Sequence, residues 1–327
     1  MDAAYDVVLR TGLPPGCHTV CYADDTLVVA GGTSWEQAVA RANWAMVRTT
    51  LKYLGLTLDG RWGFVEHFDD LAPRVGKRAN AFRGLMPNLR GPGIGARCAY
   101  MHAVMSGALY GAPVWCGAMG ASSKIRKHLH DVQRLLALCI ARAYRASPND
   151  ALMVLAGVPP AEFLATARAT LYARVKASRL RGNDIALRTM ASWRERARRR
   201  TIEEWRNHLV ENPPTVGTRV LEAVLPHLEE WVDRPWGGLS YRITQVLTGH
   251  GCFGEYLCRI QKEPTARCHH CEAEVDSAQH TLEHCPAWDE LRRVLIDEVG
   301  EDLSLRAVVA KMVLRKSCWK AVASFCE

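Results

Sequence analysis

Apolar and polar positions alternate near the start of the chain and recur at helical spacing over most of the remainder. Residues 19–22 and 26–30 are rich in β-branched and aromatic side chains and flank a short polar turn, which predicts an antiparallel hairpin. A helix is expected from about 35 to 53, capped by Thr33 or Ser34. The alternating run 54–59 then predicts a short strand that ends at Gly60.

Beyond about residue 66 the spacing of apolar residues predicts helices almost throughout, separated by clusters of Pro and Gly. The predicted fold class is therefore mainly α with a small β element (α+β). The clusters favour three domains, at residues 1–65, 66–212 and 213–327. The expected helices cover about 66–85, 95–110, 122–145, 160–181, 186–209, 215–232, 240–249, 286–298 and 304–325.

Composition narrows the class of protein without fixing its function. The 327 residues are 48% hydrophobic and 23% charged, which excludes a wholly disordered or collagen-like chain. Twelve cysteines are too dilute for a disulfide framework, and the first ten residues show no secretory signal. We therefore expect reduced thiols in the cytosol or nucleus.

One uncharged stretch, between Arg97 and Lys124, is long enough to cross a bilayer. It contains His102, Pro113 and several glycines, so a buried helix from about 99 to 110 is the better interpretation. No contact with a membrane is expected.

Basic charge is concentrated in one helical stretch. Residues 160–210 hold 12 Arg or Lys and 5 acidic residues, nearly the whole net charge of +8. Clustered arginine is typical of proteins that bind phosphate backbones, while a solvated helix face with pairs such as Glu195–Arg199 is an equal alternative. Trp193 and Trp205 flank the run and either stack on bases or, more often for such residues, belong to the core. The candidate nucleic-acid-binding residues are Arg194, Arg196, Arg198, Arg199 and Arg200.

An acidic pair lies in the turn of the predicted hairpin, in the run Tyr22-Ala-Asp24-Asp25. Two carboxylates at one tip repel each other unless a cation lies between them. Mg²⁺ binds such carboxylates and leaves positions for substrate phosphates, as phosphoryl transfer requires. The hypothesis is a catalytic magnesium site at Asp24 and Asp25, and the alternative is a solvated turn.

A cluster of Cys and His near the end has metal-ligand spacing. Cys268, Cys271, His280 and Cys285 form a Cys-x2-Cys-x8-His-x4-Cys pattern, which predicts a closed, structural zinc site. His284 competes with Cys285 as the fourth ligand, and free thiols in a small helical unit are the alternative to metal binding.

Together these motifs resemble the reverse transcriptases of non-LTR (LINE-type) retrotransposons, most closely the arthropod lineages that insert into ribosomal DNA. The resemblance is carried by the Tyr22–Asp25 run, by Lys52–Asp59 (Lys-Tyr-Leu-Gly-Leu-Thr-Leu-Asp) and by the terminal pattern from Cys268 to Trp288.

The resemblance implies a role for each of these segments. Asp24 and Asp25 would be palm-domain ligands for Mg²⁺, and Leu54-Gly55 would grip the primer terminus. The helices after Phe68 would form the thumb and a connector, and residues 268–285 a zinc knuckle that holds nucleic acid. The implied activity is RNA-directed DNA polymerisation on an RNA template and a DNA primer or target, in the nucleus and cytoplasm.

The chain also departs from the family pattern. Only Asp2 and Asp6 precede the hairpin as candidates for the third palm carboxylate, and the segment that normally separates the hairpin from Leu54-Gly55 is shortened. We therefore expect a C-terminal, internally deleted fragment of the enzyme that is inactive alone. The alternatives are a non-enzymatic nucleic-acid-binding zinc-knuckle protein and a fragment that does not fold stably.

Overall fold

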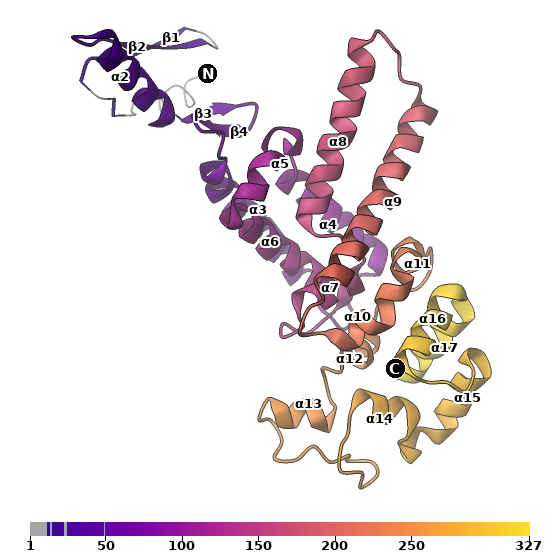
Figure 1. Ribbon diagram of the computed structural model, residues 1–327. Coiled ribbons are helices and arrows are strands. Elements are labelled where there is room, and N and C mark those ends of the chain that lie inside the picture. Colours follow the sequence, from indigo (N-terminus) through magenta and orange to yellow (C-terminus); the bar gives the residue numbers. More distant parts are fainter. Residues whose placement is uncertain (1–11, 14, 23–24, 49) are drawn as a thin grey trace.

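The computed structural model describes residues 12–13, 15–22, 25–48 and 50–327. Over this part of the chain it confirms a mainly α-helical protein with two small antiparallel sheets, each of two strands. Figure 1 shows the strands at the N-terminal end, a body of packed helices, and one helical hairpin that projects from that body.

The first hairpin pairs β1 (Cys17–Tyr22) with β2 (Asp25–Ala30), in a register that sets Tyr22 opposite Asp25. The helix α2 (Trp35–Arg48) follows and packs on it. Ser34 Oγ accepts a hydrogen bond from the Gln37 backbone N–H at 3.2 Å, and the Gln37 side chain accepts one from the Thr33 N–H at 2.7 Å. The side chains of Ser34 and Gln37 thus cap the start of the helix, and Ser34 is one of the two cap residues that the sequence predicted.

The second hairpin corrects the prediction for residues 49–59. The helix ends at Arg48 rather than 53, and β3 (Thr50–Tyr53) pairs with β4 (Leu56–Asp59) where a single strand was expected. Leu54 and Gly55 form the turn, with φ of 46° and 81°. Positive φ at both central residues is typical of a type I′ turn, whose twist matches that of paired strands.

The helices that follow form the body of the molecule (Figure 1). They are α3 (Val65–Gly84), α4 (Ile94–Ala108), α5 (Ala112–Ala121), α6 (Ser123–Ala141), α7 (Asn149–Ala156), α8 (Ala161–Leu180), α9 (Leu187–Glu211), α10 (Thr218–Val224), η1 (Leu225–His227), α11 (Leu228–Asp233), α12 (Tyr241–Thr248), α13 (Gly254–Arg259), α14 (Ala278–Glu283), η2 (Pro286–Trp288), α15 (Asp289–Val299), α16 (Leu305–Leu314) and α17 (Lys316–Cys326).

Two hydrophobic cores hold these helices together. The first core joins β4, α3, α4, α5, most of α6 and the start of α8 around Phe68 and Trp115. The second core joins the end of α6, α7, the end of α9, α10 to α12 and α14 to α17 around Trp205, Trp231 and Trp319. Because α6 contributes to both cores, it connects the two halves of the body.

Several predicted helix boundaries were wrong for local reasons. Pro113 lies in the first turn of α5, behind Gly111 at φ 69°, so the expected break is the start of a new helix. The short helices α7, α13 and α14 were not predicted. The expected helix 215–232 divides near Pro226, and the expected helix 304–325 divides at Arg315, whose extended backbone has no Pro or Gly to signal it.

No single helix in the described part of the chain is long and apolar enough to cross a membrane. Only α7 and α8 taken together, with a bend of 53° between them, have the length and apolar composition of a membrane span. All of α7 from Ala151 to Leu155 is buried in the second core. The cysteines that the structure describes are free thiols.

Candidate zinc centre and basic arm

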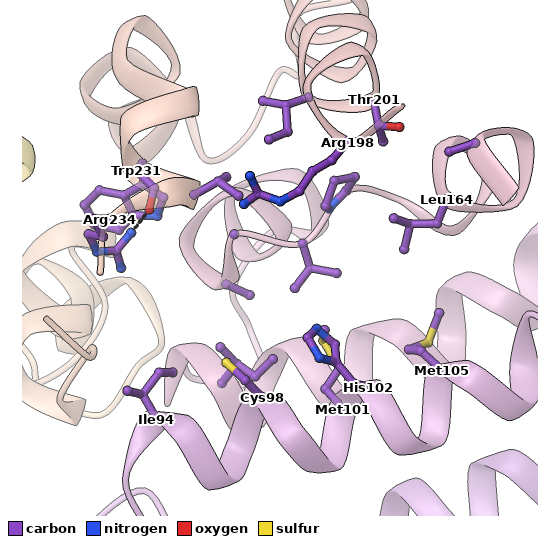
Figure 2. Close-up of a pocket in the computed structure, with 18 of the residues that line it drawn as sticks. Ile94, Cys98, Met101, His102, Met105, Leu164, Arg198, Thr201, Trp231 and Arg234 are labelled. Carbon is purple, nitrogen blue, oxygen red and sulfur yellow. Dashed lines mark hydrogen bonds between the residues drawn. The ribbon is translucent and has the colours of Figure 1, made fainter. Parts of the chain in front are cut away.

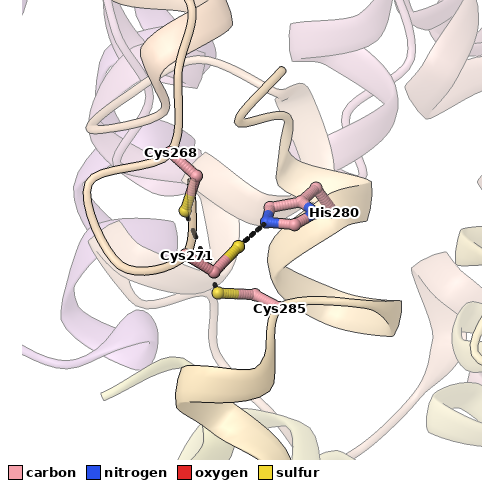
Figure 3. A group of neighbouring side chains, drawn as sticks. All are labelled: Cys268, Cys271, His280 and Cys285. Carbon is pink, nitrogen blue, oxygen red and sulfur yellow. Dashed lines mark hydrogen bonds between the residues drawn. The ribbon is translucent and has the colours of Figure 1, made fainter. Parts of the chain in front are cut away.

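The structure brings the four predicted zinc ligands together. One ligand atom from each of Cys268, Cys271, His280 and Cys285 lies within 4.8 Å of all the others (Figure 3). Cys268 Sγ is 3.9 Å from Cys285 Sγ, and Cys271 Sγ is 3.2 Å from His280 Nε2. Sulfurs bound about 2.3 Å from a tetrahedral zinc ion lie about 3.8 Å apart. The donor set and its spacing therefore fit zinc.

A loop and a short helix position these side chains. Backbone hydrogen bonds from Cys268 N to Ala273 O (2.9 Å) and from Asp276 N to Ala266 O (2.7 Å) close the loop that carries the first two thiols. Ser277 then caps α14 by accepting from the His280 N–H at 3.0 Å. The cap fixes the first turn of α14, and the His280 side chain points to Cys271 of the loop (Figure 3).

The fourth ligand is held by a buried arginine. Arg292, on α15, is 7% exposed and donates to the carbonyl oxygens of Leu282 (3.0 Å), Thr281 (3.2 Å) and Cys285 (2.6 Å). It also pairs with Asp289. These bonds satisfy carbonyls at the end of α14 that have no partner within the helix. They fix the backbone of Cys285 beneath the cluster.

The structure favours Cys285 over His284 as the fourth ligand. The His284 side chain is 69% exposed and pairs with Glu283 at 3.3 Å, away from the cluster. His269 is likewise exposed and pairs with Glu263 at 2.9 Å, and the His270 ring packs against Trp288. Burial, with the neighbouring thiols of Cys271 and Cys268, raises the pKa of Cys285 to about 11. A bound divalent cation would instead favour its thiolate.

The predicted basic stretch belongs to the projecting hairpin of α8 and α9 (Figure 1). We call residues 166–200 the basic arm. All of them are described, none is buried, and they include eleven Arg or Lys but only Asp184 and Glu195 as acids. Leu180 and Leu187 beside the loop at its tip are 79% and 90% exposed.

The five arginines singled out on α9 divide into two groups. Arg198 pairs with Asp233 of α11, and both Arg194 and Arg198 line a pocket at the base of the arm. Arg196, Arg199 and Arg200 are exposed and do not line the pocket, and two of them form the pairs Arg199–Glu195 (3.0 Å) and Arg200–Glu204 (2.7 Å). Both interpretations of the stretch therefore have support: it is a solvated helix face with ion pairs, and it keeps a large positive excess.

The two tryptophans that flank this stretch have different surroundings. Trp205 is 1% exposed and belongs to the second core. Trp193 lies on the arm, where the guanidinium of Arg174 stacks over its ring at 4.3 Å.

The remaining predicted site residues lie at the N-terminal end. Asp24 and the side chain of Asp25 lie outside the described residues, as do Asp2 and Asp6. Leu54, 71% exposed, and Gly55 form the tip of the second hairpin, where Tyr110 Oη donates to Leu54 O at 3.0 Å. The structure thus places the Leu54-Gly55 turn against Tyr110, in the turn between α4 and α5.

Sequence reasoning missed the groups that the fold assembles from distant segments. Arg292 is one of them. Another is Arg234, whose guanidinium lies between the rings of Trp231 (4.1 Å) and Trp319 (4.5 Å). No local pattern indicates such an arrangement, because the partners of Arg234 lie on different helices.

Comparisons with known proteins give four significant relatives, all from retrotransposable elements of insects. A 115 kDa protein of the type-1 element R1DM from Drosophila melanogaster is 27% identical, matching 89% of this chain and 33% of its own length. A Pol polyprotein of the type-1 element R1 4 from Nasonia vitripennis is 26% identical, matching 78% of this chain and 64% of its own. A third, from Bradysia coprophila, is 24% identical over 75% of this chain and 25% of its own.

The chain thus spans about one third to two thirds of the length of the first two relatives. No family model and no solved structure matches. The resemblance predicted from the sequence motifs is confirmed. The homologues of this chain are R1 type-1 non-LTR retrotransposon proteins of arthropods, which it matches at modest identity over most of its length.

Proposed function

We propose that this chain is the nucleic-acid-binding C-terminal part of an R1-type reverse transcriptase, and that its basic arm binds the phosphate backbone of RNA or DNA. In this proposal residues 1–65 are a palm remnant, 66–212 the thumb and connector, and 213–327 a C-terminal region with a zinc knuckle. The intact enzyme would use Mg²⁺ at Asp24 and Asp25 and act in the nucleus and cytoplasm.

The observation that carries the proposal is the charge of the basic arm. The basic arm carries eleven cationic side chains, and none of its residues is buried, so the arm contributes little to either core. A solvated structural helix needs no such excess of one sign, whereas binding to a polyanion gains from each counterion that the arm releases.

The zinc centre fits a structural role better than a phosphate-binding one. Residues 254–285 carry six acidic residues against Arg259, Lys262 and Arg267. Three thiolates around one Zn²⁺ add a further negative charge. The proposed knuckle would therefore hold the fold of this region, and the arm would supply the affinity for nucleic acid.

The proposal also holds that the chain does not polymerise alone. The alignment with the D. melanogaster relative spans 347 positions, more than the 327 residues of this chain, although it covers only 89% of it. The relative thus has residues with no counterpart here, which supports the internal deletion. We expect no incorporation in a primer-extension assay with Mg²⁺ or Mn²⁺. Incorporation that an Asp24→Ala variant loses would contradict this expectation.

Salt dependence tests the binding function. The full chain should bind single-stranded RNA or DNA with an affinity that falls about tenfold or more between about 50 and 200 mM salt. The triple variant Arg196→Gln, Arg199→Gln, Arg200→Gln should weaken binding and flatten that slope by about 0.7 for each phosphate that the arm no longer neutralises.

The matched control removes three positive charges elsewhere, on α16 and α17: Arg306→Gln, Lys311→Gln and Lys316→Gln. It should bind as the wild type does. Equal losses of affinity in both triple variants would show that net charge, rather than the arm, causes binding. Binding that does not depend on salt would overturn the proposal.

The second candidate function is a nucleic-acid-binding zinc protein with no enzymatic role. This candidate predicts the same salt dependence of nucleic-acid binding, so polymerase activity has to decide between the two candidate functions. A longer natural form of the chain that carries the missing carboxylate and polymerises would favour the enzyme.

A further inference from the structure

A pocket of about 710 Å³ lies at the base of the basic arm, between α4, α8, α9 and the segment that follows α11 (Figure 2). Cys98, Met101, His102 and Met105 line it from α4, and Arg198 and Thr201 line it from the opposite side on α9. Its volume is within the range of small-molecule sites, about 300–1,000 Å³.

The lining combines apolar walls with one sign of charge. Four arginines line the pocket, from three elements, and no lining residue is acidic. They are Arg168 on α8, Arg194 and Arg198 on α9, and Arg234 just after α11. Only Arg198 has an acidic partner, Asp233, within the described residues.

Arg234 is the most constrained of these cations. It lies between two indole rings and donates to the Trp231 carbonyl, yet its buried Nε has no hydrogen-bond partner in the part of the chain described. Burial lowers its pKa to about 10. An unpaired N–H beside a cavity leaves a donor for an acceptor atom of a ligand.

We propose that this pocket holds an unpaired base of a single-stranded nucleic acid, with the flanking phosphates against the arginines. The inference rests on the proposed function, which brings a nucleic-acid strand to the arm directly above the pocket. A planar base suits the apolar walls, because stacking and burial stabilise it. Cations on three elements suit several phosphates of one strand better than the single carboxylate of a lipid.

The test compares two strands with equal numbers of phosphates: a fluorescein-labelled oligothymidine of twelve nucleotides and an abasic strand of the same length. The wild-type chain should bind the oligothymidine about tenfold more tightly by fluorescence anisotropy, since each stacked base contributes to affinity. In Ala197→Phe, which fills the pocket from α9, this preference should fall below about twofold.

The matched control is Arg196→Ala, on the exposed face of the same helix. It should weaken binding of both strands by the same factor and keep the preference for bases. A second filling variant, Ala167→Leu on α8, repeats the test if Ala197→Phe melts at a lower temperature than the wild type.

Three outcomes would overturn the inference in different ways. If both filling variants keep the full preference for bases, the pocket does not hold a base, although the arm still binds nucleic acid. If neither strand binds the wild-type chain, the proposed function fails as well. Saturation of the pocket by a long-chain carboxylate that does not compete with the oligothymidine would assign it to a lipid instead.

Discussion

At the scale of single residues, buried arginines donate hydrogen bonds to backbone carbonyl oxygens that have no hydrogen-bond partner within a helix. Arg97 is 1% exposed and donates to the carbonyl oxygens of Pro92 (2.9 Å), Pro87 (2.6 Å) and Cys139. Arg292 does the same for the end of α14. In both cases one guanidinium satisfies several acceptors, because its five N–H groups point in fixed directions.

Arg292 should act on zinc affinity without touching the metal. In Arg292→Met the carbonyl of Cys285 loses its donor, so the ligand backbone is less constrained. We expect zinc affinity about tenfold weaker, in the range found when groups behind metal ligands are removed. Competition with a chromophoric chelator measures it.

The exposed His284 provides the control for that measurement. His284→Ala should bind zinc as the wild type does, whereas Cys285→Ser should lose most of the affinity. A large loss of zinc affinity in His284→Ala would show that the predicted set of four zinc ligands is wrong.

At the scale of elements, polar pairs between helices supplement the apolar packing. His130 Nε2 of α6 is 2.6 Å from Glu162 Oε2 in the first turn of α8. The hydrogen bond to Glu162 raises the pKa of His130, and the bond to His130 lowers the pKa of Glu162 against the opposing effect of burial. The pair therefore links the base of the arm to the helix that both cores share.

The pH dependence of the stability that this pair contributes follows from the raised pKa of His130 and the lowered pKa of Glu162. The raised pKa of His130 gives stability that is complete below its unfolded value of about 6.5 and is lost as pH rises through its folded value. The lowered pKa of Glu162 gives stability present above its unfolded value of about 4.3 and lost as pH falls. The melting-temperature difference between wild type and His130→Gln should therefore be largest at about pH 5–6 and smaller at pH 8.5.

Glu162→Gln is the matched control, because it keeps the size of the side chain and removes the charge. In that background the extra stabilisation by His130 at about pH 5–6 should be lost, because the hydrogen bond to Glu162 is the largest cause of the raised pKa of His130. A difference that grows toward pH 8.5 in the wild-type background would refute this account.

The sequence predicts elements well where the signal is local. The predicted zinc ligands have a spacing set by one loop and one short helix, and the capping bonds of Thr33, Ser34 and Gln37 join neighbouring residues. The Leu54-Gly55 turn was missed, although it contains a glycine, because neighbouring residues 35–53 have helical periodicity. The pocket could not be predicted from the sequence, because Arg198, Arg234 and Met101 are brought to its walls only by tertiary packing.

At the scale of the whole molecule, the zinc region is a satellite of the second core. Leu282 of α14 and Leu295 of α15 belong to that core, while the first core is built from residues 56–165. If the cluster binds zinc as proposed, metal binding in a unit with so few buried apolar residues would supply much of its folding free energy. Stability should therefore be uneven along the chain.

Zinc removal should expose that difference. After chelation, amide hydrogens from 254 to 299 should exchange faster by a factor of about ten or more, while those of α3 and α6 keep their protection. Hydrogen-exchange mass spectrometry with and without chelator measures both regions in one sample. Uniform loss of protection along the chain would show that the two cores unfold together.

The basic arm has one more consequence, which concerns its length. Its two helices leave and rejoin the body side by side, so residues added to both in equal number displace only the tip (Figure 1). Each added residue extends a helix by about 1.5 Å, and two turns in each helix would move the tip by about 11 Å. A related protein with longer or shorter α8 and α9 helices would thus have an arm of different reach, without repacking of either core.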